Sequence, residues 1–517
     1  MASPDNLDDA HTHRATAPPA SSSTARGTFR RQDGTEVELV AFPPGDCANP
    51  RNWPLWRKWS IVSVIMLIDL TVSWAASGFS PATMKFEKDL GVSSEVATLG
   101  LSLYVLGLAF GPMTLAPLSE YFGRSPIYIG SYGVFLLFLI GTATVQNLGG
   151  FLALRILSGL FSSVTIANFG GTIADLFEPQ DTGLPMSIFL WAATFGSPSG
   201  YMLMSFVAQT RPWRDVFWAL LGICGGIWIV MSLTLRETRH SIILLRRAAK
   251  ERKERGTDAI EVPESMKQRG PRELFQVALT RPFRFLFTEA IIVFGALYNG
   301  YLYGLSFLFN GAFSIVFGEK GHGFNVIGVG LSFLGIMIGI SLGPVSNLAQ
   351  ERYYQRRIAS LGGRNVPEAR VQMAKVAAVT FPISLFWFAW TTYTSIHWIV
   401  PILASALWGW SFYTLILMTY MVTEDSYKVF SASALAGLGL IRNIAGAGFP
   451  LFATQMFGRL GDQWTLSLLA FLAVLLIPIP FVLSRYGRSL RLRSPWARQH
   501  MDDITAEEET NGKPADV

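Results

Sequence analysis

Three ionisable side chains lie inside long apolar stretches of this sequence, and they are the first candidates for chemistry. Asp69, Arg155 and Arg442 are each flanked by hydrophobic residues. An ionisable group at the centre of a membrane helix costs on the order of 2.5–3.5 kcal/mol by insertion scales, so its presence indicates a function. Asp69 can take up and release a proton, which makes it the candidate for proton coupling. Arginine keeps its proton, so Arg155 and Arg442 can pair with a carboxylate or hold an anion.

Polar side chains recur at helical spacing along four apolar stretches, which predicts a polar lining. Residues three or four positions apart share one face of a helix, and a polar face in lipid must look into protein or water. For a single serine or threonine, a hydroxyl satisfied by its own helix carbonyl is an equally open interpretation. The four stripes are Asp69, Ser73, Ser77 and Ser80; Arg155, Ser158, Ser162 and Thr165; Asn299, Tyr303, Ser306 and Asn310; and Ser405, Trp408, Phe412 and Thr419. The expected lining of a substrate cavity is Ser73, Ser77, Ser158, Ser162, Asn299, Tyr303, Ser306, Trp408 and Arg442.

The sequence has no pattern typical of a metal, nucleotide or redox site. His322 and His397 lie near the ends of apolar stretches without metal-ligand spacing, and the other four histidines lie in polar segments. Cys47 and Cys224 are too far apart in sequence and context for a disulfide framework. No GxxxxGK[ST] phosphate loop occurs. A membrane-embedded enzyme is therefore disfavoured, no metal or cofactor is expected, and the proton gradient is the expected energy source.

Composition places these residues in a membrane protein. Of the 517 residues, 50% are hydrophobic and only 15% are charged, and the mean hydropathy is +0.35. Soluble domains carry about 25% charged residues. Most of the +6 net charge lies between and after the apolar stretches, where bases mark the cytoplasmic side of a membrane protein. Nucleic-acid binding is therefore not expected, and lipid is the expected surrounding.

The apolar stretches are long enough to cross a bilayer, which needs about 20 residues per helix. Twelve qualify, so the predicted fold is an all-α polytopic membrane protein with twelve transmembrane helices in two pseudo-symmetric six-helix halves. The expected spans are 59–82, 96–118, 126–146, 149–173, 185–208, 214–235, 285–310, 324–348, 373–395, 398–422, 431–457 and 464–484.

The polar segments set the expected domain organisation and orientation. Lysine and arginine concentrate in the loops that share a side with both termini, so both termini are expected to be cytoplasmic. Within the central segment, "GPRELFQVALTRPFRFLF" predicts a short helix lying in the membrane interface. The expected divisions are a disordered tail over 1–57, an N-terminal half over 58–235, a cytoplasmic linker over 236–284, a C-terminal half over 285–484 and a cytoplasmic tail over 485–517.

An internal repeat supports two halves. Shifted by 232 residues, "GLAFGPMTLAPLSEYFGRSP" meets "GISLGPVSNLAQERYYQRR", so that Gly111, Pro112 and Arg124 fall on Gly343, Pro344 and Arg356. Glycines four apart let helices approach closely, and this structural role is the expected one for the GxxxGP spacing. Two six-helix halves that rock about a site near the bilayer midplane are a transporter architecture.

These features resemble the major facilitator superfamily, and within it the fungal twelve-span drug:proton antiporter family. The landmarks are "NPRNWPLWRKW", "APLSEYFGRS", "RILSG", "LRETRHSIILLRRAAKERK" and "YGRSLRLRSPWA", and the similarity runs from about Asn49 to Trp496. The resemblance implies that Arg155 takes part in proton transfer. A purely structural ion pair between Asp69 and Arg155 is the open alternative.

The family's loop motif maps onto Glu120, Gly123 and Arg124, which implies a charged clamp that controls opening. The sequence departs from the motif at Ala116, Tyr121 and Ser125. Only Glu120 and Arg124 therefore remain as the charged pair of the expected clamp. The antiporter motif of the fifth span is kept only at Gly196 and Gly200, with Pro198 as the expected source of a bend.

The resulting functional prediction is a monomeric transporter in the plasma membrane, with the vacuolar membrane as the alternative. It would export a small organic compound in exchange for protons. Two embedded arginines favour an organic anion, and an amphiphilic drug fits the many aromatic residues. The family resemblance implies a secondary metabolite or an organic acid such as itaconate as the substrate. A polyamine or broad multidrug transporter is the alternative. A transport-inactive membrane sensor or scaffold is the candidate from a different class.

Overall fold

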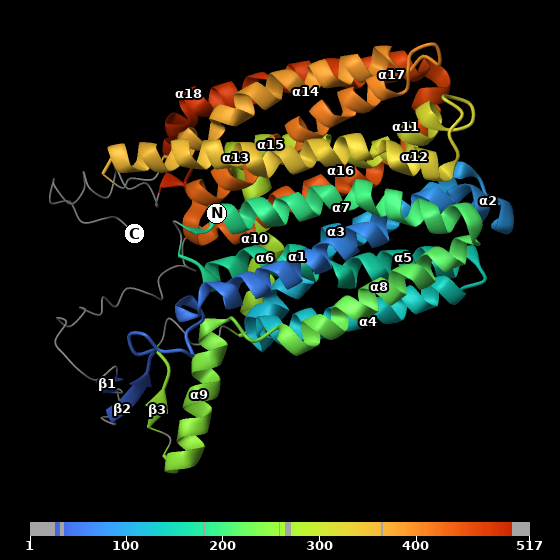
Figure 1. The fold of residues 1–517 in the computed structure, drawn as a ribbon. Helices are drawn as coiled ribbons and strands as arrows, with labels where there is room; N and C mark the ends of the chain where they lie inside the picture. The colour runs from blue at the N-terminus through green and yellow to red at the C-terminus, as the bar shows by residue number, and fades with distance from the viewer. Residues whose placement is uncertain are drawn as a thin grey trace, which may run out of the picture.

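The computed structural model describes residues 26–30, 36–178, 181–257, 259–263, 270–362 and 366–498. Long helices run side by side in one bundle, with the N-terminal helices in one part and the C-terminal helices in the other (Figure 1). The linker helices α9 and α10 and a small sheet lie at one end, here called the linker end. The opposite end is called the far end.

Six crossing elements form the N-terminal half. A turn at Gly78 and the short helix α2 (Thr83–Leu90) extend the first of them at the far end, and Ser163 interrupts the fourth. The crossing helices are α1 (Leu55–Ser77), α3 (Ser94–Phe122), α4 (Arg124–Thr144), α5 (Leu148–Ser162) with α6 (Val164–Leu176), α7 (Gly183–Thr210) and α8 (Trp213–Thr234).

The C-terminal half repeats this order. Its third crossing element begins with a short 3-10 helix, η5 (Pro367–Val371). The crossing helices are α11 (Ala290–Phe317), α12 (Val326–Ser332) with α13 (Leu334–Ser360), α14 (Gln372–Trp390), α15 (Ile399–Tyr427), α16 (Ser431–Leu460), and α17 (Asp462–Leu476) with α18 (Pro478–Arg493).

Each of the twelve expected spans therefore coincides with a crossing element. Among the described residues, eleven helical stretches are long and apolar enough to span a membrane by length and composition. The twelfth is α7, whose serines and threonines lower its hydropathy. Ser187, Thr194 and Ser199 are each no more than 3% exposed, so these polar groups face neighbouring helices.

The beginning of the second helix in each half shows the repeat at the level of the backbone. Gly91 and Gly323, which are 232 residues apart, both have positive φ, at 62° and 76°. Two residues later, Ser93 caps α3 by accepting the Val96 N–H, and Asn325 caps α12 by accepting the Gly328 N–H. Glycine adopts positive φ without steric cost, so the same turn starts the second crossing element of both halves.

The two halves meet along two seams. One seam joins α3 to α16, and the other joins α7 to α12 and α13. On the α7 seam, the Tyr201 hydroxyl lies 2.8 Å from Ser314 Oγ near the far end, and the Ser187 hydroxyl lies 2.6 Å from the Tyr413 hydroxyl nearer the linker end. Contacts at both levels show that the halves are closed against each other along this seam.

The segment expected as a disordered tail is partly ordered. Strands β1 (Arg26–Arg30), β2 (Glu36–Val40) and β3 (Ile260–Glu261) form a small sheet in the order β1-β2-β3, with β1 antiparallel and β3 parallel to β2. Helix α9 (His240–Arg255) packs on it through Leu244 and Ala248. The expectation is wrong for residues 26–30 and 36–57, because β1 pairs with β2 and apolar positions of β2 find partners in the distant linker. Residues 1–25 and 31–35 lie outside the described part of the chain.

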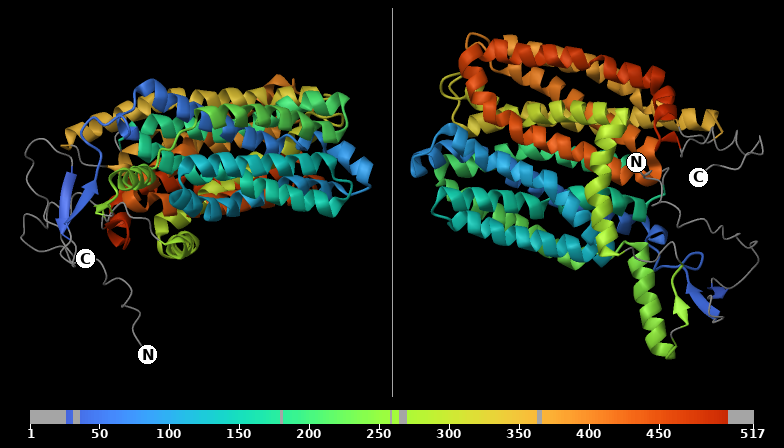
Figure 2. Two further views of the ribbon diagram at one scale, coloured as in Figure 1. Left: turned by 90° about the horizontal axis from the view of Figure 1, so that it is seen from below. Right: turned by 180° about the vertical axis from the view of Figure 1, so that it is seen from behind.

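Helix α10 (Pro271–Thr288) forms where the interfacial helix was predicted. It runs across the bundle at the linker end, as the view from behind shows (Figure 2). It contacts α3 of one half and α11 and α16 of the other. Leu286 packs with Ala109 and Met113 of α3 and Leu440 of α16. Helix α10 therefore covers the α3–α16 seam.

Candidate functional site

Asp69 lies near the middle of α1 and is 2% exposed. Its Oδ1 accepts a 2.8 Å hydrogen bond from Thr165 Oγ1 of α6. Its Oδ2 finds no hydrogen-bond partner among the described residues. A buried carboxylate oxygen without a partner costs free energy, so this oxygen is a place where a proton or a donor from a substrate would be stabilised.

Arg442 of α16 faces the same region from the other half, close enough to interact electrostatically with Asp69. Its Nη1 donates a 2.6 Å hydrogen bond to the Tyr420 hydroxyl, and its guanidinium lies 4.6 Å from the ring centroid of Tyr303. Its Nε finds no partner among the described residues. The site thus holds an acid from one half and a base from the other, each with one unsatisfied polar atom.

Asn299 of α11 makes a comparable polar contact in the C-terminal half. Its Nδ2 donates 2.6 Å to Thr419 Oγ1 of α15, whereas in the N-terminal half the fourth crossing element is the donor, from Thr165 to Asp69. The first and fourth crossing elements of each half therefore face each other through a polar pair. The C-terminal pair is uncharged. Of these two pairs, only the N-terminal one contains a titratable carboxyl group, that of Asp69.

Arg155 does not pair with Asp69. Its Nε, Nη1 and Nη2 donate to the carbonyls of Gly100, Ala75 and Ala76 at 2.5, 2.9 and 3.2 Å, and its guanidinium lies 4.6 Å from the Tyr104 ring centroid. Ala75 and Ala76 belong to the last turn of α1, whose carbonyls have no partner within the helix. The interpretation of a structural Asp69–Arg155 ion pair is therefore wrong for this conformation.

Several expected cavity residues pack helices together. Ser77 donates 2.7 Å to the Ser197 carbonyl of α7, and Ser162 accepts 2.8 Å from the Tyr104 hydroxyl. Trp408 lies 4.6 Å from the Phe309 ring in an aromatic cluster. Ser158 is fully buried without a hydrogen-bond partner among the described residues, whereas Ser73 and Ser306 are half-buried. The closed halves leave Asp69, Thr165, Asn299, Tyr303 and Arg442 as the polar centre.

The glycines of the repeat provide close helix contacts, as the structural interpretation predicted. A Cβ on Gly111 would lie 1.9 Å from Ser163 Oγ, and one on Gly343 would lie 2.0 Å from the Tyr413 ring. Pro112 and Pro344 follow them inside α3 and α13. A second pair, in α7, lies against α1: a Cβ on Gly196 would meet Ser73 and one on Gly200 would meet Ser77, with Pro198 between them inside the helix.

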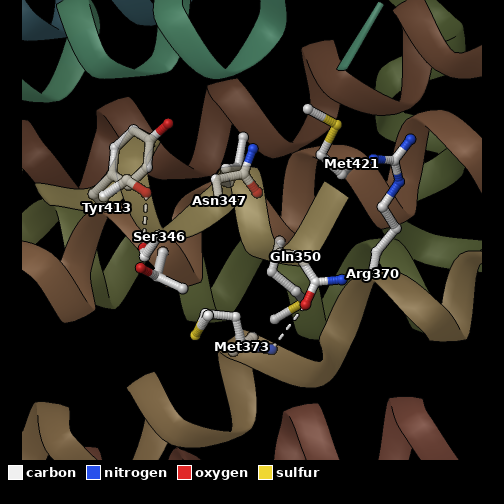
Figure 3. A pocket seen from close by; sticks show the side chains of 12 residues that line it. Ser346, Asn347, Gln350, Arg370, Met373, Tyr413 and Met421 are labelled. Atoms are coloured by element: carbon white, nitrogen blue, oxygen red, sulfur yellow. Dashed lines mark hydrogen bonds between the residues drawn. The ribbon is translucent and has the colours of Figure 1, made fainter. Parts of the chain in front are cut away.

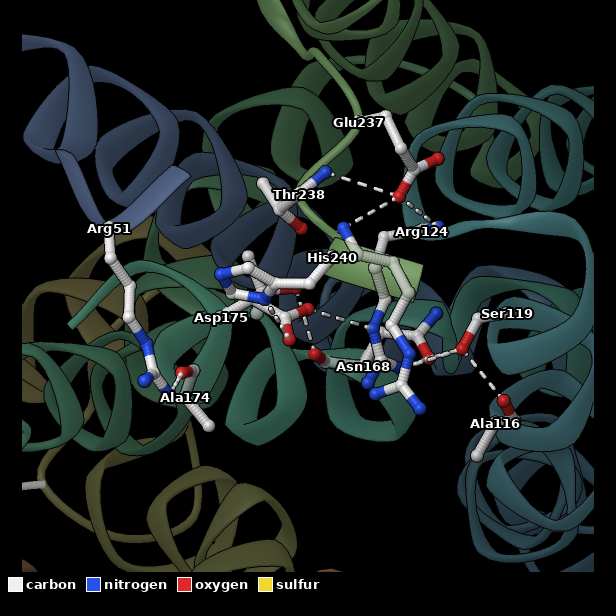
Figure 4. A network of polar contacts seen from close by, with 12 residues as sticks. Arg51, Ala116, Ser119, Arg124, Asn168, Ala174, Asp175, Glu237, Thr238 and His240 are labelled. Carbon is white, nitrogen blue, oxygen red and sulfur yellow. Dashed lines mark hydrogen bonds and ion pairs between the residues drawn. The ribbon is translucent and has the colours of Figure 1, made fainter. Parts of the chain in front are cut away.

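The charged clamp at the linker end uses a different acid from the one expected. Arg124 Nε lies 3.7 Å from Asp175 Oδ2 at the end of α6, and Arg124 Nη1 donates to Ser119 and Asn168 (Figure 4). The Glu237 carboxylate accepts the Arg124 backbone N–H at 2.9 Å beside Gly123, whose φ is +105°. Glu120 is not among these partners. The clamp is therefore Arg124 with Asp175.

The C-terminal counterpart of Arg124 is Arg370, not Arg356. Arg370 in η5 pairs with Glu351 and lies 2.9 Å from Asp425 at the linker end of α15, as Arg124 pairs with Asp175 at the end of α6. Figure 3 shows Arg370 beside Gln350 and Met421, with Tyr413 and Ser346 further along the same pocket. Arg356 is exposed on α13. The 232-residue shift fails here because the link between the second and third crossing elements is longer in the C-terminal half.

Sequence reasoning missed Asp175, Glu237 and Arg370. Each lies at or just beyond a helix end, where charged residues are expected in any membrane protein. A signal did exist for Asp175 and Asp425, since both lie in the last turn of the fourth crossing element of their half. The different lengths of the loops hid this correspondence.

Twelve crossing helices in two related halves, with a polar centre between them, define a secondary transporter. The chain belongs to the Major Facilitator Superfamily, whose family model matches residues 62–450. The members of this family are transporters, and the protein is a multi-pass membrane transporter and not an enzyme.

Fungal relatives resemble most of its length. It is 36% identical to "Efflux pump FUB11" of Gibberella moniliformis over 89% of this chain and 78% of the relative. It is 37% identical to "Major facilitator superfamily multidrug transporter mdrA" of Aspergillus fumigatus over 90% and 77%. It is 36% identical to "Major facilitator-type transporter sorT" of Penicillium rubens over 93% of both. The chain is thus related to fungal efflux transporters.

Solved structures confirm the fold. The proton:xylose symporter XylE aligns over 84% of this chain and 97% of its own with a TM-score of 0.59 at 14% identity. The human organic anion transporter MFSD10 aligns over 83% of this chain and all of its own with a TM-score of 0.55 at 17% identity. At these identities the likeness extends to the fold alone.

Proposed function

We propose that this transporter exports a small organic compound in exchange for protons by alternating access. The observation that carries the proposal is Asp69, a buried acid whose Oδ2 has no hydrogen-bond partner among the described residues and which interacts electrostatically with Arg442 of the other half. When ionised, Asp69 attracts Arg442 and favours closed halves. When protonated, Asp69 loses this attraction, so the proton changes the balance between the closed and open arrangements.

At this site, the charge of the substrate decides whether proton binding opposes or favours substrate binding. A substrate that carries an ammonium or another donor would compete with the proton for Asp69 Oδ2, and mutually exclusive binding produces exchange. A carboxylate substrate would instead compete with Asp69 for Arg442, so it would bind best when Asp69 is protonated. Proton-driven export through this site therefore favours an amphiphilic, donor-bearing compound such as a drug or a secondary metabolite.

An itaconate-like organic acid is the second candidate, because Arg442 beside Tyr303 and Tyr420 offers a cationic site with aromatic walls. A polyamine fits this site less well. Its binding would need several carboxylates, and Asp69 is the one acid among the described residues of this polar centre. The transport-inactive sensor or scaffold has no support from this polar centre, since a sensor does not require a titratable group between the halves.

Reconstituted full-length protein tests the proposal. Proteoliposomes with an acidic interior are incubated with one of three compounds. These are the amphiphilic cation rhodamine 6G, the polyamine spermidine and the organic acid itaconate. We expect accumulation of rhodamine 6G that stops when an ionophore collapses the pH gradient. Itaconate uptake with Arg442 dependence would favour the second candidate, and failure of a broad compound panel to move would contradict transport.

We propose the plasma membrane as the location. We also propose that both termini lie in the cytoplasm, because the loop bases gather on the side of the linker. A fluorescent-protein fusion in a fungal host, imaged with plasma-membrane and vacuolar markers, tests the location. Fluorescence confined to the vacuolar membrane would support the alternative.

A further inference from the structure

A cleft opens on the α7–α13 seam at the linker end. Its volume is about 420 Å³. Its wall in the N-terminal half is Leu184, at the start of α7, and its wall in the C-terminal half is one face of α13. The residues of α13 that line the cleft are Asn347, Leu348, Glu351, Arg352, Gln355 and Arg356. Both halves of the transporter therefore contribute to the cleft, which lies away from the polar centre at Asp69.

The cleft carries positive charge that the described residues do not neutralise. Arg352 and Arg356 are exposed and one helical turn apart, so they lie on the same side of α13. Neither has an ion-pair partner among the described residues. Glu351, the acid at the same level, is already paired with Arg370. An anion entering the cleft would thus meet two available guanidinium groups.

The other end of the cleft is apolar. Leu184 and Leu348 are 44% and 46% exposed, and further along α13 Leu342 and Val345 are 53% and 63% exposed. Exposed aliphatic side chains followed within two turns by exposed arginines mark the passage from the hydrocarbon region to the headgroup region. The arginines therefore lie at the depth at which lipid phosphates are found.

We propose that this cleft binds one anionic phospholipid. The phosphate lies between Arg352 and Arg356, the amide of Asn347 donates to its oxygens, and the acyl chains cover Leu184 and Leu348. The Gln355 amide already donates 2.8 Å to Glu351. The apolar part of the cleft favours a lipid over a free phosphate. Because Leu184 belongs to one half and the arginines to the other, the bound lipid bridges the seam and favours the arrangement that is closed at the linker end.

Native mass spectrometry of the full-length protein in detergent tests the proposal, with phosphatidylglycerol as the probe and phosphatidylcholine as the neutral comparator. The variant Arg352→Ala/Arg356→Ala should bind phosphatidylglycerol about thirtyfold more weakly, since two bases near a membrane surface together contribute about 2 kcal/mol. Leu348→Trp, which fills the cleft and keeps both charges, should also weaken binding. Arg352→Lys/Arg356→Lys should retain most of it.

The matched control is Arg485→Ala/Arg493→Ala, which removes two exposed arginines of α18 at the same end of the bundle. It should change phosphatidylglycerol binding by less than about twofold. Equal losses in both double variants would overturn the proposal, because general charge would then explain the binding. Displacement of phosphatidylglycerol by millimolar inorganic phosphate would also overturn it and would identify a soluble anion as the ligand. Equal melting temperatures of the variants exclude a folding defect.

Discussion

Thr165 Oγ1 donates a 2.8 Å hydrogen bond to Asp69 Oδ1, which joins the first and fourth crossing elements of the N-terminal half at the centre of the molecule. The Asn299–Thr419 pair makes the corresponding contact in the C-terminal half. Both contacts join the first and fourth crossing elements of their half, but the direction of the hydrogen bond differs and only the first contact contains an acid. This asymmetry is the structural basis for placing proton coupling at Asp69.

Replacement of this acid by its amide tests the coupling. Asp69→Asn can still accept the Thr165 hydrogen bond, so the fold should be retained, whereas pH-driven accumulation should fall at least about tenfold. Proteoliposome uptake with an imposed pH gradient measures the change. The control Asp462→Asn alters an acid at the start of α17 and should transport normally. Wild-type uptake by Asp69→Asn would show that the proton is coupled elsewhere.

We predict that the role of Arg155 is to stabilise the fold. Arg155→Ala leaves the carbonyls of Ala75, Ala76 and Gly100 without their donor and should destabilise the protein by at least about 3 kcal/mol, since a hydrogen bond to a charged group contributes about 1.5–3 kcal/mol. Thermal melting in detergent measures this loss. A stable Arg155→Ala variant that has lost only pH-driven transport would instead support the role in proton transfer that the family resemblance implies.

The strength of the interaction between Arg124 and Asp175 can be measured as a coupling free energy. A double-mutant cycle of Arg124→Ala and Asp175→Ala should give about 1–2 kcal/mol, in the range for residues in direct contact. The same cycle with Glu120→Ala should give less than about 0.5 kcal/mol. Equilibrium unfolding in mixed micelles supplies the free energies. A larger coupling to Glu120 would restore the pair that the sequence motif suggested.

The two candidate counterparts of Arg124 should differ strongly. Arg370→Ala leaves Glu351 and Asp425 without their base, and removal of one partner from a buried pair costs about 3–5 kcal/mol. Arg356→Ala removes an exposed side chain and should cost less than about 0.5 kcal/mol. Melting temperatures in detergent without added lipid compare them. Similar shifts would mean that the 232-residue correspondence also holds at this position.

Docking of the N-terminal segment on α9 should depend on pH. The Ala48 N–H and Arg247 hold the pKa of the Asp46 carboxyl below its ordinary value near 3.8. The folded pKa is the lower one, so this contact stabilises docking above the ordinary pKa and is lost as the pH falls through the folded value. Hydrogen exchange at Ala48 should accelerate over that acidic range. Asp46→Ala, which removes the acceptor of the Ala48 N–H, should show fast exchange already at neutral pH, and slow exchange in that variant would contradict the role of the carboxylate.

The sequence by itself determined the twelve crossing helices, the two halves and the placement of Asp69 within the first helix. These features depend on the length and polarity of local segments, and hydrophobic length alone decides whether a helix can cross a bilayer. The glycine spacing of the repeat also predicted close helix packing, which the contacts of Gly111 and Gly343 confirm.

Only the tertiary structure decided which charged and polar groups are partners. The positions of Ser73, Ser77, Ser162 and Trp408 on a polar face did not show whether a neighbouring helix covers that face. Arg155 binds carbonyls that are available because α1 ends at Ser77, and Arg124 finds Asp175 51 residues away in sequence. A loop of different length moved the counterpart of Arg124 from Arg356 to Arg370. Electrostatic and hydrogen-bond energies depend on distances of a few ångströms between distant segments, and helical periodicity contains no information about those distances.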